Sequence, residues 1–290
     1  MRAIRLYLRL VGTSIQTQLQ YRSSLFMQTL GQFLLYLTEF AAVAGLFSRF
    51  GSIAGWRLGE AAVLFGFADL AFAAADALGR GFDVLGSQVK RGDFDRILAR
   101  PLSPFLQVIG QELTLRRFGR FLVGALVFAW GVAQARPEPG VASAAGAAGA
   151  AGVASAAGAT VTAGVAGVAA LVAGWAGAVA TFVAIVTIQG ALTFWTVEGL
   201  EIMNALTYGG RQVSSYPMTA YRRFLRNFFL FLVPIGCSVY VPVCAFLHRP
   251  AFPGWPWWAG LLTPLSALPF CCLAALAWKA GIAHYESAGG

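Results

Sequence analysis

Long apolar runs separated by short polar stretches dominate the chain, and they predict helices that cross a membrane. A helix needs about 20 apolar residues to span the hydrocarbon core of a bilayer. Runs of this kind predict six spans, at about residues 25–48, 60–79, 118–134, 161–190, 227–247 and 257–278. Pro234 and Pro242 lie in the fifth run, where they predict a kinked or broken helix. We therefore expect an all-α polytopic membrane protein.

Two stretches outside these runs have patterns of their own. Residues 1–22 carry apolar side chains at helical spacing beside Arg2, Arg5 and Arg9, which is typical of a helix that lies on the membrane surface. Residues 140–159 are almost wholly Ala, Gly and Ser, which gain little free energy by entering the bilayer. We interpret this tract as an external loop or a weak helix.

The composition agrees with the membrane class. Of the 290 residues, 58% are hydrophobic and 11% are charged, whereas a soluble globular protein carries about 25% charged residues. A soluble enzyme, a disordered chain and a coiled coil are therefore excluded. The net charge is +9, but the basic residues adjoin the apolar runs. We interpret them as cytoplasmic anchors rather than as contacts to nucleic acid.

The distribution of basic residues predicts the orientation. With six spans and a cytoplasmic N-terminus, 17 of the 21 lysines and arginines fall in cytoplasmic segments. This inner set includes Arg117, Arg120, Arg211, Arg222, Arg223 and Arg226. The four expected outside are Arg49, Arg57, Arg136 and Arg249. A seventh crossing through the Ala/Gly tract would weaken this bias, so we expect both termini in the cytoplasm.

Five acidic residues lie in or beside the apolar runs. Glu39, Asp69 and Asp76 fall in the first two, and Glu198 and Glu201 lie near the inner end of the fourth. A carboxylate in hydrocarbon is costly and is a candidate for a substrate or ion site, with Glu39 and Asp69 the strongest here. Alternatively, these acids face the bundle interior, paired with arginines or backbone donors. No lysine or arginine lies deep in a predicted span as an obvious partner.

Soluble catalytic motifs are absent from the sequence. No glycine-rich phosphate loop followed by Lys-Ser or Lys-Thr is present, so the chain is not expected to hydrolyse ATP itself. His248 and His284 are expected at opposite membrane faces, where they cannot share a metal. The four cysteines lie in apolar stretches without metal-ligand spacing, at positions 237, 244, 271 and 272. We expect no metal, no cofactor and no catalytic residue in this chain.

The segment 80–104 stands out because it carries charges of both signs in a chain with few charges. It is bounded by Gly81 and Pro101, and it follows the second predicted span. Such a segment favours a cytoplasmic helix that docks on a soluble partner. The alternative is a positively charged anchor with no further role.

Several motifs together resemble a known family. The run after the second span contains Gly92, Asp93, Asp95, Leu98, Arg100, Pro101, Leu102 and Ser103. The end of the chain contains Trp278, Gly281, Tyr285, Ser287 and Gly289 at a second characteristic spacing. In this order they resemble the permeases of type-2 ATP-binding-cassette (ABC) exporters, and more narrowly a six-span branch of them. The Ala/Gly tract is longer than the corresponding loop of that family.

The resemblance implies that the chain is the transmembrane subunit of an ATP-driven exporter in a bacterial inner membrane. A second permease subunit, identical or paralogous, would complete the pathway, and a cytoplasmic ATP-binding subunit would hold ATP and Mg. Segment 80–104 would be the coupling helix, with contacts to the ATPase from Asp93, Asp95, Arg96, Arg100 and Pro101. Candidates for lining the pathway are Glu39, Asp69, Phe194 and Trp195.

The apolar cavity with few acids that we expect favours a small amphipathic or cationic molecule as the exported substrate. Membrane lipid is the remaining expected partner. An alternative function is ATP-independent secondary transport that uses the intramembrane acids, although the two halves of the chain show no visible repeat. A membrane assembly factor is a further alternative, but it would usually carry a large external domain.

Overall fold

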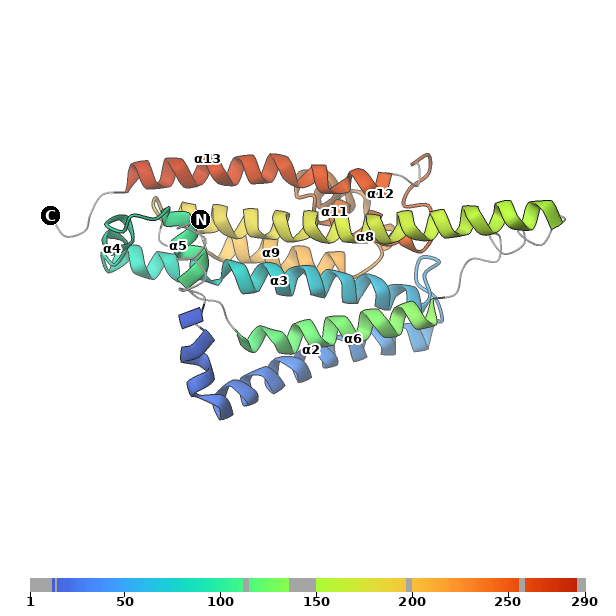
Figure 1. Ribbon diagram of the computed structural model, residues 1–290, viewed down its shortest axis with the longest axis horizontal. Helices are drawn as coiled ribbons and strands as arrows, with labels where there is room; N and C mark the ends of the chain where they lie inside the picture. The colour runs from blue at the N-terminus through green and yellow to red at the C-terminus, as the bar shows by residue number, and fades with distance from the viewer. Residues whose placement is uncertain are drawn as a thin grey trace.

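The computed structural model describes residues 12–13, 15–111, 115–135, 150–196, 200–255 and 259–285, and these residues form a helical bundle (Figure 1). The longer helices are α2 (Arg22–Phe50), α3 (Leu58–Lys90), α6 (Phe118–Gln134), α8 (Ala150–Leu192), α9 (Leu200–Ser214), α11 (Ile235–Phe246) and α13 (Leu268–His284). The shorter ones are α4 (Phe94–Leu98), α5 (Pro104–Gln111), η1 (Leu115–Arg117), η2 (Met218–Ala220), α10 (Arg223–Asn227), the π-helix η3 (Phe228–Leu232), α12 (Ala259–Leu262) and η4 (Thr263–Ala267).

Four helical segments are long and apolar enough to cross a membrane, so the protein is multi-pass. They are α2, α3, Val165–Leu192 of α8, and Ala259–His284. The bent pair Arg223–Leu232 and Ile235–Phe246 adds a fifth if it counts as one span. Helix α6 is apolar but has only 17 residues. The all-helical membrane class is confirmed, with four or five candidate spans among the described residues.

Helix α3 forms the centre of the bundle and is buried along most of its length. It packs against α6 at contacts where the backbones nearly touch. A Cβ built on Gly66 would lie 2.5 Å from the backbone nitrogen of Phe128, and one on Gly131 would lie 2.6 Å from that of Val63. Glycine is therefore required at both positions, because any side chain would push the two helices apart.

Helix α8 makes similar contacts with the C-terminal helices. A Cβ on Gly174 would lie 2.3 Å from Pro242, and one on Gly177 would lie 2.7 Å from Pro264. The helix begins at Ala150, so residues 150–159 of the Ala/Gly tract are helical, which is the second of the two alternatives for this tract. Residues 140–149 lie outside the described residues, as do residues 1–11 of the expected surface helix.

The predicted fifth span is broken. Arg223–Leu232 and Ile235–Phe246 meet at an angle of 96°, and Pro234 lies at the break, where its ring and missing N–H prevent a continuous helix. The proline signal is confirmed, but residues 227–247 do not form one straight crossing. Helix α9, which lies between the fourth and fifth predicted spans, packs on α3, α8 and α11.

The break also determines where the arginines of α10 lie, of which Arg226 has the clearest contacts. The Arg226 guanidinium carbon lies 5.8 Å from the centre of the Phe252 ring. The ring centres of Phe252 and Tyr240 lie 5.6 Å apart, as do those of Tyr240 and Trp56, which lies just before α3 begins. The short helix α4 lies beyond the opposite end of α3 (Figure 1). Arg226 therefore lies on the side of the bundle that holds Arg249 rather than beside α4, which differs from the predicted grouping of the basic residues.

Candidate functional site

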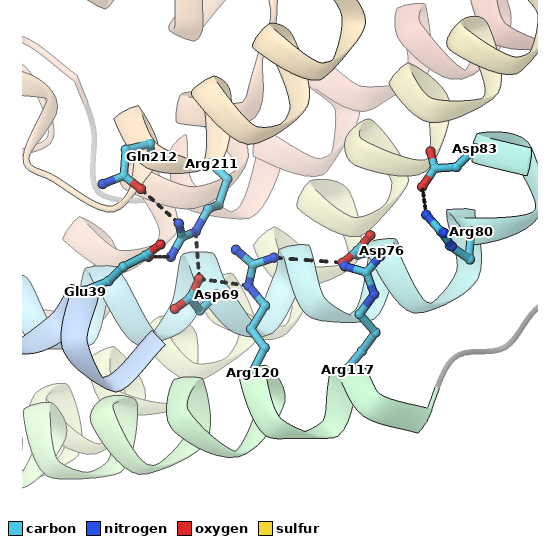
Figure 2. Close-up of polar contacts among 9 residues, drawn as sticks. All are labelled: Glu39, Asp69, Asp76, Arg80, Asp83, Arg117, Arg120, Arg211 and Gln212. Carbon is cyan, nitrogen blue, oxygen red and sulfur yellow. Dashed lines mark hydrogen bonds and ion pairs between the residues drawn. The ribbon is translucent and has the colours of Figure 1, made fainter. Parts of the chain in front are cut away.

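Six charged side chains meet inside the bundle and form a continuous network between five helical segments (Figure 2). Three are acidic and three are basic, so their formal charges cancel. The acids are Glu39 on α2 with Asp69 and Asp76 on α3, and the bases are Arg117 on η1, Arg120 on α6 and Arg211 on α9. We call this set the buried ion network.

Arg211 joins α9 to two other helices. Its Nε lies 2.8 Å from Oδ1 of Asp69, and its Nη2 lies 2.5 Å from Oε2 of Glu39. The remaining terminal nitrogen, Nη1, donates a hydrogen bond to the side chain of Gln212 at 2.9 Å. One guanidinium thus fixes the position of α9 relative to both α2 and α3, which is the kind of contact that the planar fork of arginine favours.

Arg120 occupies the middle of the network. Its Nε lies 3.4 Å from Oδ1 of Asp69, and its Nη1 lies 3.9 Å from Oδ2 of Asp76. The guanidinium carbon also lies 4.0 Å from the ring centre of Tyr36 and 4.3 Å from that of Phe72. These aromatic faces provide electrostatic attraction where water is excluded. Arg117 completes the network by pairing with Asp76.

The network is deeply buried. The side chains of Asp69 and Arg120 are 0% and 1% exposed, while that of Glu39 is 32% exposed. Removing charges from water is costly, so such a group is stable only when each charge has a partner. The arrangement agrees with the alternative in which the intramembrane acids face the bundle interior and pair with arginines. The charge distribution predicts Arg117, Arg120 and Arg211 in cytoplasmic segments, but their side chains are buried in the bundle.

A spacing signal in the sequence would have revealed part of this network. Asp69, Asp76 and Asp83 follow one another at intervals of seven residues. Seven residues make about two helical turns, so the three carboxylates lie on one face of a helix. Arg117 and Arg120 are three residues apart and share a face in the same way. Asp83 makes its own contacts, to Arg80 at 3.1 Å and to Gln189 at 3.4 Å.

The predicted coupling segment contains the end of α3 and the short helix α4, and α4 has a buried side and an exposed side. Residues 80–90 continue α3, and α4 follows after a turn. Phe94 and Ile97 point inward and are buried, whereas Arg96, Arg100 and Pro101 are exposed. Asp93 and Asp95 are partly exposed beside them. The residues expected to contact an ATPase are thus all exposed or partly exposed.

An aromatic cluster anchors α4 to the ends of two long helices. The Phe94 ring lies 5.1 Å from that of Phe194, which follows α8, and 5.0 Å from that of Tyr285, which follows α13. Trp278 of α13 contacts Phe194 at 5.9 Å and Phe82 of α3 at 5.4 Å. We call these five rings the α4 aromatic cluster.

Gln107 fixes the connection between α4 and α5. Its amide nitrogen donates to the carbonyl oxygens of Ile97 at 2.8 Å and of Leu102 at 3.1 Å. The side chain is fully buried. The loop that carries Arg100 and Pro101 is therefore held by hydrogen bonds on its inner side, while its outer side stays accessible.

The structure divides the expected pathway residues into two groups. Glu39 and Asp69 meet in the buried ion network, but Phe194 lies in the α4 aromatic cluster. Trp195 is exposed and stacks on His284 with ring centres 5.6 Å apart. Glu198 and the side chain of Glu201 lie outside the described part of the chain. The four expected pathway residues thus do not form one site.

A family model described as ABC-2 family transporter protein matches residues 33–136 and 149–289. The match covers most of the chain, including the buried ion network, α4 and the C-terminal motif. No curated protein and no solved structure gives a significant match. The chain therefore belongs to the ABC-2 family of transporter proteins, of which it is a membrane subunit.

Proposed function

We propose that this membrane subunit forms half of the translocation pathway of an ATP-driven exporter and receives the force of ATP hydrolysis through α4. Membrane proteins of the ABC-2 family work with ATP-binding subunits and typically lack an ATPase domain of their own. The chain thus needs a surface on which such a subunit docks. We assign that surface to Asp93, Asp95, Arg96, Arg100 and Pro101.

The observation that carries this proposal is the contrast between the two faces of α4. The side chain of Arg96 is 82% exposed and that of Asp93 is 42% exposed, whereas Phe94 on the inner face is fully buried. Both signs of charge are present, so the surface can complement a partner and reject incorrect ones. A helix built this way receives a partner outside and transmits its movement inside.

The α4 aromatic cluster provides the route for that movement. Displacement of Phe94 acts directly on Phe194 and Tyr285, which follow α8 and α13. Asp95 of α4 also lies beside the Tyr285 hydroxyl, and burial together with this carboxylate raises the pKa of Tyr285. The ATP-binding subunit must hold α4 differently in its two conformational states. The difference in binding energy between those states then shifts the helical bundle from one arrangement to the other.

The pathway itself would lie along α2 and be completed by a second permease subunit. The carboxylate of Glu39 borders a shallow apolar groove formed by Leu34, Leu35, Thr38 and Ala42. A partly exposed acid beside apolar side chains suits a small amphipathic or cationic substrate. In this proposal α6 is also a membrane span and brings the total to six. Its 17 helical residues are about 25 Å long, which is close to the thickness of the hydrocarbon core. The α4 end then faces the cytoplasm of a bacterial cell.

Affinity purification in mild detergent, followed by an ATPase assay, tests the docking surface. The double variant Arg96→Glu/Arg100→Glu should lose the co-purifying ATP-binding subunit and its vanadate-sensitive hydrolysis. The matched control is Arg49→Glu. It reverses the charge of an exposed arginine at the C-terminal end of α2, which is outside the proposed docking surface. Retention of the ATPase at the wild-type level by the double variant would refute the assignment.

The same purification separates this function from secondary transport. If the chain is recovered without any ATPase, and if transport in vesicles depends on the proton gradient alone, the protein is a secondary transporter. In that case Glu39 would be the coupling group, although it pairs with Arg211 in the structure. Glu39→Gln would then abolish transport, whereas in the proposed exporter ATP-driven transport persists without a proton gradient.

A further inference from the structure

The bent segment Arg222–Leu232 presents an unusual surface at the end of the bundle opposite α4. It consists of α10 and the π-helix η3, which lie at 96° to α11. Phe224 is 82% exposed, and Phe231 and Leu232 are 65% and 63% exposed. The π-helix inserts an extra residue into the turn, a feature that often occurs at functional sites.

These exposed side chains line a shallow apolar groove. Its walls are Phe224, Asn227, Phe228, Phe231 and Leu232, all of them on α10 and η3. The rings of Phe224 and Phe228 lie 6.4 Å apart and are tilted by 32° to each other. In a membrane such a groove fits an acyl chain.

Three arginines accompany the groove. Arg222 and Arg223 are exposed, and Arg226 lies partly buried over the Phe252 ring. No acidic residue occurs in the sequence between Glu201 and Glu286. Among the described residues, none of the three arginines forms an ion pair, whereas Arg211 and Arg249 are both paired with carboxylates. The groove therefore has a concentrated positive charge at one side.

Aromatic side chains pack beside Arg226. Phe252 contacts Trp255 and Tyr240, each with ring centres 5.6 Å apart. The series continues from Tyr240 to Trp56, which lies just before α3 begins. The arginines and the apolar groove therefore lie in the part of the bundle that is farther from α4.

We propose that this groove binds an anionic phospholipid of the leaflet at that end of the bundle. The phosphate would contact Arg222, Arg223 and Arg226, since guanidinium groups bind phosphate oxygens through paired hydrogen bonds. One acyl chain would occupy the groove along Phe224, Phe228 and Phe231. A soluble anion leaves the groove empty, and a zwitterionic lipid brings its own positive group close to the arginines beside its phosphate, so the two features together favour an anionic lipid.

Lipid retention measures this site directly. The protein, purified with the subunits that accompany it, is placed in nanodiscs of phosphatidylglycerol and phosphatidylcholine, extracted, and its bound lipid is counted by native mass spectrometry. We expect the wild type to keep phosphatidylglycerol preferentially. The variant Arg222→Gln/Arg223→Gln should retain about tenfold less of it, because each arginine strengthens attraction to an anionic headgroup.

Matched variants distinguish the site from general charge effects. Arg49→Gln/Arg91→Gln removes two exposed arginines elsewhere and should retain phosphatidylglycerol like the wild type. Phe224→Ser leaves the three arginines in place and should still lower retention, since it opens the groove. Soluble glycerol phosphate should not displace the lipid, because it lacks the acyl chain.

Two outcomes would overturn the proposal. One is equal retention of phosphatidylglycerol by the wild type and by Arg222→Gln/Arg223→Gln. The other is a change in the number of chains per particle in these variants with lipid retention unaltered, which would make the surface an interface between two copies of the chain. Neither outcome depends on whether the ATP-binding subunit docks at α4.

Discussion

The buried ion network and the outer face of α4 use the same residue types in opposite surroundings. Asp69 and Arg120 are almost completely buried, whereas Arg96 is mostly exposed. Breaking a buried ion pair costs about 3–5 kcal/mol, but an exposed pair contributes about 0–1 kcal/mol. Charge inside the bundle therefore determines how the helices are arranged. Charge on α4 contributes little to stability and remains available to a partner.

The largest effect is expected at Asp69, because both Arg211 and Arg120 use its Oδ1 oxygen. Asp69→Asn should destabilise the protein by about 3–5 kcal/mol, since it leaves two buried guanidiniums with one fewer negative charge. Thermal unfolding in detergent measures the loss. Adding Arg120→Gln restores the charge balance and should recover part of the stability. Wild-type stability of Asp69→Asn would show that the network does not hold the helices together.

A steric change reaches the same network without altering charge. Gly66→Ala puts a methyl group 2.5 Å from the Phe128 backbone nitrogen, so α3 and α6 must separate near Asp69 and Arg120. We expect a loss of about 2–3 kcal/mol in unfolding free energy. Gly45→Ala is the control, because nothing lies within 4 Å of its added Cβ. It should be neutral or slightly stabilising in the same unfolding measurement.

An intermediate effect on stability is expected for the ion pair between Glu60 and Arg249, at the N-terminal end of α3. Glu60 accepts hydrogen bonds from Arg249 at 2.8 Å and from the backbone N–H of Arg57 at 2.8 Å. These partners are less buried than the central network. Glu60→Gln should therefore cost about 1.5 kcal/mol in unfolding free energy. A loss as large as that of Asp69→Asn would mean that burial does not explain the difference between the two regions.

The smallest effect on stability is expected on α4. Asp93 pairs with Arg91 at 3.3 Å and with Arg96 at 3.8 Å, and all three are exposed or partly exposed. Asp93→Asn should change unfolding free energy by less than about 1 kcal/mol. The same variant should lower ATPase activity in the purified complex. A stability loss without a change in hydrolysis would reverse the roles that we assign to the two regions.

The candidate site was only partly visible in the sequence. Glu39 and Asp69 stood out because carboxylates are rare in apolar runs, and the charged α4 segment stood out for the same reason. Their partners did not, because Arg117 and Arg120 lie at the edge of an apolar run. An arginine there can reach the membrane surface or turn inward, and both choices give the same one-dimensional pattern. Phe194 was grouped with the acids, although it packs with aromatic rings under α4.

By itself, the sequence determined the membrane class, the all-helical fold and the family, since these follow from composition, apolar run length and local motifs. It also predicted the break at Pro234, which depends on the chemistry of one residue. Only the tertiary structure decided that Arg120 and Arg211 face Asp69, and that Arg226 lies at the end opposite α4. Those placements depend on which distant helices supply a carboxylate or a ring, and helix packing, not local pattern, makes that choice.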